Sequence, residues 1–319
     1  MKSSNIGGQA VLEGIMMKNG DRYAVGVRRP DQEIEVRVQE HKSFVPGAIR
    51  KIPFIRGVFN FIDSLILGMK ALMFSAEFIE DEEEEARELT ADEAAREEKK
   101  ESLVMSIVLV FSILLAVGIF MVLPYFLSGL LKRFITSRSV LTVLEGLIRV
   151  LIFLGYITLV SRMKDIQRTF MYHGAEHKCI NCIEHGLDLN VENVRASSRQ
   201  HKRCGTSFLF FVMIVSIIFC FFITAESQVM RVLLRIALMP LIAGVSYEII
   251  RLAGNSDNPV VNLLSQPGLW VQNMTTKEPD DSMIEVAIQA VEAVFDWKEY
   301  QAENFKAAAG MAGHAQGVS

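Results

Sequence analysis

Four long apolar runs dominate the hydrophobic pattern of this 319-residue chain. A helix needs about 20 mostly apolar residues to cross a bilayer, and each run meets or nearly meets that length. We therefore predict a mainly α-helical, polytopic membrane protein with about four transmembrane helices. The runs cover residues 103–131, 140–161, 206–224 and 230–252.

A different pattern precedes these runs, in residues 1–45. Residues 23–29 and 33–39 alternate apolar and polar positions, and Pro30-Asp31 between them is typical of a turn. The alternation predicts a β-hairpin within a small cytosolic element.

Residues 46–79 are apolar but interrupted by charges. Asp63, Lys70 and Glu77 recur every seven residues, which places them on one stripe of a helix. This spacing favours an amphipathic helix that lies in the membrane interface over a helix that crosses the bilayer. The orientation of every later segment depends on that choice.

In the middle of the chain, an acidic segment precedes the apolar membrane domain. Residues 80–101 are strongly acidic and have no apolar face, so we predict a solvated helix or a linker there. The membrane domain of four spans follows at 102–252. It includes a polar loop at 162–205.

The C-terminal segment, residues 253–306, should start irregularly. It is rich in Gly, Asn, Pro and Asp as far as residue 279, which is typical of loops. An amphipathic helix is expected from Asp281 to about Phe305, followed by a disordered tail at 307–319.

Basic residues predict the orientation in the membrane. The 162–205 loop contains eight of them, the 132–139 turn three and the 225–229 turn none. The positive-inside rule therefore places the loop and both termini in the cytosol. No apolar signal segment follows Met1, and the four cysteines are expected to be reduced.

Composition also indicates the partners. Residues 77–101 hold 13 of the 37 acidic and 4 of the 33 basic residues, so the rest of the chain is mildly basic and suits anionic lipid headgroups. Nothing resembles a motif for RNA or DNA, so no nucleic acid partner is expected. The acidic run and the C-terminal helix could recruit cytosolic proteins. The sequence is also compatible with a homo-oligomer.

The densest chemistry lies in YHGAEHKCINCIEHG, residues 172–186. A helix is predicted from Lys164 to His185, with Gly186 as its stop. At 100° per residue, His173, His177 and Glu184 share one face with Glu176 beside them.

The residues of this face match a known metal-binding sequence motif. His173 and His177 are i, i+4 neighbours and, with Glu176, match the HxxEH pattern, in which two histidines bind a divalent metal and the glutamate acts as acid or base. Zinc suits such ligands best. A third ligand could be Glu184, Glu248, His201 or Cys204, and our leading hypothesis takes Glu184 or Glu248.

Two other interpretations stay open. The histidines could lie on a solvated face and bind nothing. Alternatively, Cys179 and Cys182 could form a closed zinc site with His201 and Cys204, at zinc-ribbon spacing. The helical wheel argues against the second, because the two cysteines of the helix lie on another face than the histidines.

Four further charged residues need an explanation. Glu145 and Arg149 are i, i+4 neighbours inside the second predicted span, where a mutual ion pair is expected. Glu248 near the end of the last span could pair with Arg251. Glu13 follows paired glycines that we interpret as a turn.

Several motifs resemble the YqhQ-like bacterial membrane proteins, a family of unknown function described as predicted metal-dependent enzymes. The resemblance implies a bacterial plasma-membrane protein, and it places Glu176, Glu184 and the metal-ligand candidates His173, His177, His201 and Cys204 in the family pattern. Cys179 and Cys182 are additions of this chain. The matching segments are GGQAVLEGIMM (7–17), EGLIR (145–149), SRMKDIQRTFMYHGAEHK (161–178), ENVRASSRQHKRCGTSFL (192–209), SYEIIRLAG (246–254) and PGLWVQNMTTKEP (267–279).

The resulting hypothesis is metal-assisted hydrolysis of a peptide, lipid or phosphoester bond at the cytosolic membrane surface. The alternative from another class is a non-enzymatic scaffold or regulator with a structural metal site. A transporter that uses Glu145 and Arg149 is weaker, because four spans without broken helices leave little room for a pathway.

Overall fold

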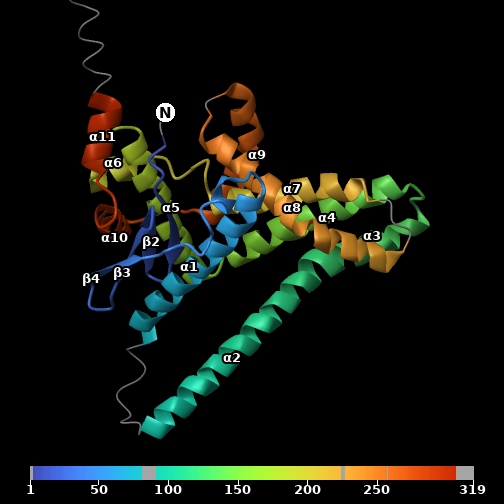
Figure 1. Cartoon of the computed structure of the whole chain (residues 1–319), viewed down its shortest axis with the longest axis horizontal. Helices are drawn as coiled ribbons and strands as arrows, with labels where there is room; N and C mark the ends of the chain where they lie inside the picture. The colour runs from blue at the N-terminus through green and yellow to red at the C-terminus, as the bar shows by residue number, and fades with distance from the viewer. Residues whose placement is uncertain (1–2, 81–90, 224–226, 257, 307–319) are drawn as a thin grey trace, which may run out of the picture. The chain divides into compact units, whose positions relative to one another are not determined.

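The computed structural model describes residues 3–80, 91–223, 227–256 and 258–306, and the chain is mainly helical (Figure 1). It divides into two compact units. The first contains Met1–Ile79, Leu159–Val212 and Pro240–Ser319, and the second contains Glu80–Thr158 and Met213–Met239. The acidic run at 81–90 and the tail at 307–319 lie outside the described residues.

A four-stranded antiparallel sheet is the centre of the first unit. The strands β1 (Gly7–Val11), β2 (Gly14–Asn19), β3 (Arg22–Arg28) and β4 (Ile34–Glu40) are neighbours in chain order. The predicted hairpin is confirmed as β3 and β4, which pair in the register Val25↔Arg37. The first hairpin was not predicted.

The interpretation of Gly7 and Gly8 as a turn is wrong, because both lie in β1 and the turn falls at Leu12 and Glu13. A Cβ added at Gly8 would lie 2.6 Å from the Met16 carbonyl oxygen and 3.1 Å from the Glu176 carboxyl carbon. Glycine is needed here for close packing of the strand on a helix.

Helices cover both faces of the sheet (Figure 1). On one face lies α1 (Ile55–Glu80), and on the other lie α5 (Lys164–Glu184) and α10 (Asp281–Glu292). The alternation of β2 divides its side chains accordingly: Met16 packs toward α1, and Ile15 and Met17 pack toward α5 and α10. Burial on both faces fixes the register of the strands.

The predicted end of α5 is confirmed. Gly186 has φ +75°, which a glycine adopts without strain, and the Leu187 N–H donates to the Cys182 carbonyl at 3.1 Å. After it come α6 (Val191–Ala196) and a loop that leads to Cys204.

The prediction of an irregular segment at 253–279 is wrong. Residues Pro259–Thr275 form α9, because Asn258 caps the helix by accepting a hydrogen bond from the Val260 N–H and Pro259 occupies the first turn, where it costs nothing. The predicted helix at 281–305 is divided into α10, α11 (Trp297–Gln301) and a π-helical turn (Ala302–Lys306). A short 3₁₀ turn, Ile49–Lys51, precedes α1.

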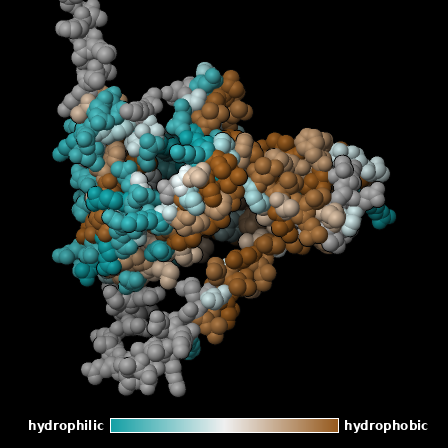
Figure 2. Space-filling model, viewed as in Figure 1, coloured by the Kyte–Doolittle hydropathy of each residue, from teal (hydrophilic) through white to brown (hydrophobic). Residues whose placement is uncertain are grey.

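The second unit is helical throughout its described secondary structure. It contains α2 (Ala91–Val117), a π-helical turn (Gly118–Val122), α3 (Leu123–Leu130), a 3₁₀ turn (Leu131–Arg133) and most of α4 (Arg138–Val160). Parts of α7 (Gly205–Phe221) and α8 (Gln228–Gly254) complete it. In Figure 2 the surface of these helices is mostly hydrophobic, whereas that around the sheet is mostly hydrophilic.

Four described helices are long and apolar enough to cross a membrane: Ile55–Phe78, Ser106–Arg133, Ser139–Val160 and Leu233–Gly254. This set differs from the prediction. The run at 206–224 forms the 17-residue α7, which is short for a span, and α1 qualifies although we predicted an interfacial helix. Asp63, one of the charges on which the interfacial prediction was based, does not face solvent: it is buried and lies 3.0 Å from the His41 ring nitrogen. The interfacial placement, the topology and the cytosolic termini stay predictions.

Candidate metal centre

The helix α5 carries the centre on its buried C-terminal half. All of its residues from Gly174 to Glu184 are buried. A Cβ at Gly174 would lie 2.0 Å from the Lys277 carbonyl oxygen, so the absence of a side chain lets the segment after α9 cross α5 directly. The carbonyl oxygen of Thr275, the last residue of α9, lies 2.9 Å from His173 Nδ1.

Polar side chains of α5 hold the loop that leads to Cys204. The Lys178 ammonium donates to the Arg195 and Ser197 carbonyls, both at 2.8 Å. Asn181 donates to the Ser198 carbonyl at 2.6 Å. The loop therefore lies against the helix, although 27 residues separate Cys204 from His177 in sequence.

The cluster consists of His173, His177 and Cys204, whose ligand atoms all lie within 4.8 Å of one another. His173 Nε2 lies 3.3 Å from the Cys204 sulfur, and the two imidazole rings are 4.5 Å apart. His177 Nδ1 lies 2.6 Å from the Arg199 carbonyl oxygen. Since a carbonyl oxygen only accepts, each Nδ1 carries the proton and donates it, which leaves Nε2 for another partner.

Electrostatics couple the sulfur to the histidines. Burial alone would raise the pKa of Cys204, but the charges and hydrogen bonds of His173 and His177 lower it well below its usual value. Burial likewise lowers the pKa of His173, yet the Cys204 sulfur and Glu176 outweigh it and raise that pKa to about 9. The cluster thus favours a thiolate, the form of cysteine that binds metals.

Glu176 lies beside the cluster on the same helix. Its carboxylate is 6% exposed and accepts a hydrogen bond from the Gly8 N–H at 3.0 Å. Burial raises the pKa of Glu176, which the charges of His177 and His173 only partly offset. A raised carboxyl pKa is what a group that exchanges protons near neutral pH requires.

Glu184 and His201 belong to a separate ion-pair network, contrary to the hypothesis that Glu184 completes the ligand set. The Glu184 carboxylate accepts hydrogen bonds from Arg203 at 2.5 Å and from the Ser4 N–H at 2.8 Å. His201 Nε2 lies 3.5 Å from the same carboxylate. Burial raises the pKa of Glu184, but His201 and Arg203 outweigh it and lower it to about 2. Arg203, directly before Cys204, was the sequence signal for this pairing.

Glu248 and Glu13 are also engaged elsewhere. Glu248 accepts two hydrogen bonds from the Arg56 guanidinium, at 2.8 and 2.6 Å, so it does not complete the site. The expected contact with Arg251 is long, at 4.0 Å. Glu13, in the turn between β1 and β2, accepts two hydrogen bonds of 2.5 Å from Arg168.

The zinc-ribbon arrangement does not form. Cys179 and Cys182 are fully buried among apolar side chains of the core, on the face of α5 away from the histidines. Burial raises the pKa of both thiols, that of Cys182 to about 11. The Cys182 thiol donates to the Asp188 carbonyl at 3.4 Å. Both are therefore protonated core residues, as the helical wheel indicated.

The expected pair of Glu145 and Arg149 is present in the second unit, at 3.2 Å. The sequence reasoning missed its third member. Arg235 on α8 donates two hydrogen bonds to Glu145, at 2.5 and 2.9 Å. An arginine inside a predicted span needs a buried acidic partner, and that rule could have found it.

The donor set fits a divalent metal ion. Two imidazoles and a thiolate are ligands that zinc prefers, and three protein ligands are the number found in catalytic zinc sites. Among the described residues no other group of at least three histidine, cysteine or acidic side chains is close enough to share an ion.

The fold and this cluster define a mainly helical protein with helices of membrane-spanning length and one grouping suited to a metal. The chain belongs to the family described as "Protein of unknown function (DUF1385)", which matches residues 52–297. It is also similar to the uncharacterized protein YqhQ of Bacillus subtilis (strain 168), with 36% identity over 309 residues that cover 94% of this chain and 95% of that protein. No solved structure matches.

Proposed function

We propose that this chain is a membrane-associated, metal-dependent hydrolase whose metal ion is held by His173, His177 and Cys204. The observation that supports it most is the convergence of these three ligand atoms within 4.8 Å, with the Nδ1 of both imidazoles engaged by backbone carbonyls. Zinc suits the ligands best, and such an ion supplies Lewis-acid catalysis when bound.

Glu176 is the proposed acid and base. It lies on the same helix as the two histidines, and burial raises its pKa toward the range in which it can accept and return a proton. The Gly8 N–H fixes the orientation of its carboxylate. The bond hydrolysed belongs to a peptide, a lipid or a phosphoester near the membrane surface.

The test compares Glu176→Gln with the native chain in detergent. Elemental analysis should find about one zinc ion per chain in both, because Glu176 is not a proposed ligand. Hydrolysis of a panel of peptide, ester and phosphoester substrates should fall about 10²–10⁴-fold in the variant. Glu192→Gln, which alters an exposed carboxylate on α6, is the matched control. Equal hydrolysis by Glu176→Gln would contradict the role of Glu176.

A structural metal site in a non-enzymatic scaffold is the second candidate. It is favoured by the burial of His177 and Cys204, which are 1% and 6% exposed, and by the polar clamp of Lys178 and Asn181 on the loop. In that case Glu176→Gln would have no effect on cellular function, whereas Cys204→Ala would lower the melting temperature and abolish function together.

A further inference from the structure

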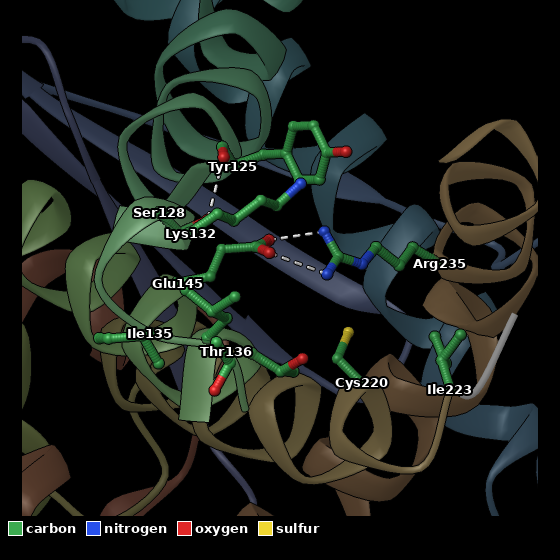
Figure 3. Close-up of a pocket in the computed structure, with 11 residues that line it drawn as sticks. Tyr125, Ser128, Lys132, Ile135, Thr136, Glu145, Cys220, Ile223 and Arg235 are labelled. Atoms are coloured by element: carbon green, nitrogen blue, oxygen red, sulfur yellow. Dashed lines mark hydrogen bonds and ion pairs between the residues drawn. The ribbon is translucent and has the colours of Figure 1, made fainter. Parts of the chain in front are cut away.

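A cavity of about 320 Å³ lies within the second unit, and none of its lining residues belongs to the proposed metal centre (Figure 3). Its walls come from α3, the turn after it, α4 and the adjoining ends of α7 and α8. Tyr125, Lys132, Glu145 and Arg235 are the polar groups that matter here, and Figure 3 shows the Arg235 guanidinium directed at Glu145.

The charges around this cavity do not balance. Glu145 is 5% exposed and accepts hydrogen bonds from both Arg235 and Arg149. Two guanidinium groups thus share one carboxylate. Lys132, whose side chain is exposed, adds a third positive charge at the cavity wall, and no acidic side chain pairs with it among the described residues. The side chains of Arg149 and Arg235 are only 15% and 14% exposed, and excess positive charge in such surroundings is costly unless an anion neutralises it.

Hydrogen-bond donors are also left over. The Tyr125 hydroxyl and Arg235 Nε are buried and have no hydrogen-bond partner among the described residues. The Lys132 ammonium lies 5.7 Å from the centre of the Tyr125 ring. Guanidinium, ammonium and phenol donors together are the groups that proteins use to bind phosphate oxygens.

The cavity lies near the ends of helices that are long enough to span a membrane. Lys132 is in the last turn of Ser106–Arg133. Glu145 and Arg235 each lie seven residues from the first residue of α4 and α8, about 10 Å along the helix axis. In a spanning helix this depth corresponds to the boundary between headgroups and hydrocarbon. Exposed apolar side chains, including Phe126 and Leu130 on α3, adjoin the cavity residues in sequence.

We propose that this cavity binds one phosphate group, carried by the headgroup of an anionic lipid. Lys132, Arg235 and the Tyr125 hydroxyl bind the phosphate oxygens, and Glu145 holds Arg235 in place. A free phosphate ion presents the same oxygens, so the two sources are separated by experiment. The proposal does not depend on the metal centre.

The test is native mass spectrometry of the full-length chain in detergent, titrated with phosphatidylglycerol or phosphatidylcholine. One phosphatidylglycerol should bind in preference to phosphatidylcholine. Lys132→Ala should weaken that binding about fivefold, because one basic residue near a phosphate contributes about 1 kcal/mol. Tyr125→Phe, which removes only the hydroxyl, should weaken it too. Arg133→Ala changes a neighbouring exposed cation that does not line the cavity, and it should bind as the native chain does.

Inorganic phosphate distinguishes the sources. If millimolar phosphate displaces the lipid, the site takes the phosphate group from either source, and if it does not, the lipid is the ligand. Equal binding of both lipids together with no response to phosphate would overturn the proposal. So would unchanged phosphatidylglycerol binding in both Lys132→Ala and Tyr125→Phe, since both variants keep the Glu145–Arg235 pair on which local folding depends.

Discussion

Two buried polar clusters in this chain differ in how their polar side chains are paired. In the first unit, backbone carbonyls engage one nitrogen of His173 and of His177, and His173 Nε2 faces the Cys204 sulfur. In the second unit, Glu145 accepts hydrogen bonds from Arg149 and Arg235. The first cluster brings together three groups that can exchange their protons for a metal ion, whereas the second pairs its carboxylate with two guanidinium groups.

Burial of a polar side chain therefore indicates a ligand site only when its hydrogen-bond and ion-pair partners are also known. A charge that is paired inside the protein contributes to the fold. Groups whose remaining atoms converge without pairing are candidates for a ligand. By this criterion Glu184 and Glu248, which looked like ligands in the sequence, belong with Glu145, because arginines occupy their carboxylates.

Removal of the Cys204 sulfur should have the largest effect, which is the loss of bound zinc from the first unit alone. Cys204→Ala should reduce zinc from about one ion per chain to almost none, because two histidines alone hold zinc weakly. Cys182→Ser is the control, since its thiol lies in the core and a hydroxyl can keep the same donation. Elemental analysis of the purified proteins measures the result. Full zinc content in Cys204→Ala would show that the cluster is not the metal site.

Loss of the shared carboxylate should be the largest effect on stability. Glu145→Ala leaves two buried guanidinium groups without a counter-ion, which should lower the unfolding free energy by about 3–5 kcal/mol and leave the zinc content unchanged. Glu278→Ala, at a carboxylate whose side chain is 65% exposed, should change it by less than about 1 kcal/mol. Thermal unfolding in detergent compares the two, and equal melting temperatures would contradict the paired role of Glu145.

Acid should weaken the ion-pair network of Glu184. The pKa of Glu184 is lowered to about 2, so its stabilisation is fully present above the ordinary value near 4.5 and is lost as the pH falls toward 2. Glu184→Gln should flatten the decrease in melting temperature between pH 5 and about 3. An unchanged acid profile in this variant would show that the Arg203 pair contributes nothing.

Replacement of a glycine by alanine should lower stability on α5 of the first unit but not on α4 of the second. Gly174→Ala places Cβ 2.0 Å from the Lys277 carbonyl oxygen and should cost about 1–3 kcal/mol. Gly155→Ala on α4 meets nothing within 4 Å and should be neutral or stabilising by up to about 1 kcal/mol. Melting temperatures test both, and a tolerated Gly174→Ala would mean that the crossing segment can move.

Much of the fold could be predicted where the pattern is local. The alternation in β3 and β4, the apolar runs at 103–131 and 140–161, and the stop at Gly186 all correspond to observed elements. Segments whose state depends on contacts were predicted wrongly. The paired glycines lie in a strand, where Gly8 packs closely on α5, and residues 259–275 form a helix despite two prolines, one of which occupies the first turn.

The candidate site divides in the same way. The helical period alone placed His173, His177 and Glu176 together and separated Cys179 and Cys182 from them. It could not select the third group, because the choice between Cys204, Glu184 and Glu248 depends on which arginines reach which carboxylates. Those arginines lie at 203 and 56, far from α5 in the chain or on other elements.

The helical, largely apolar character of the chain and the helix face rich in histidine and glutamate follow from residue types and a fixed period, so they can be derived from the sequence. That Cys204 lies beside this face became apparent from the folded chain alone. The other candidate ligands, Glu184 and Glu248, are paired with arginines instead. Contacts between residues that are distant in the chain leave no local pattern in the sequence, so they could not be predicted from it.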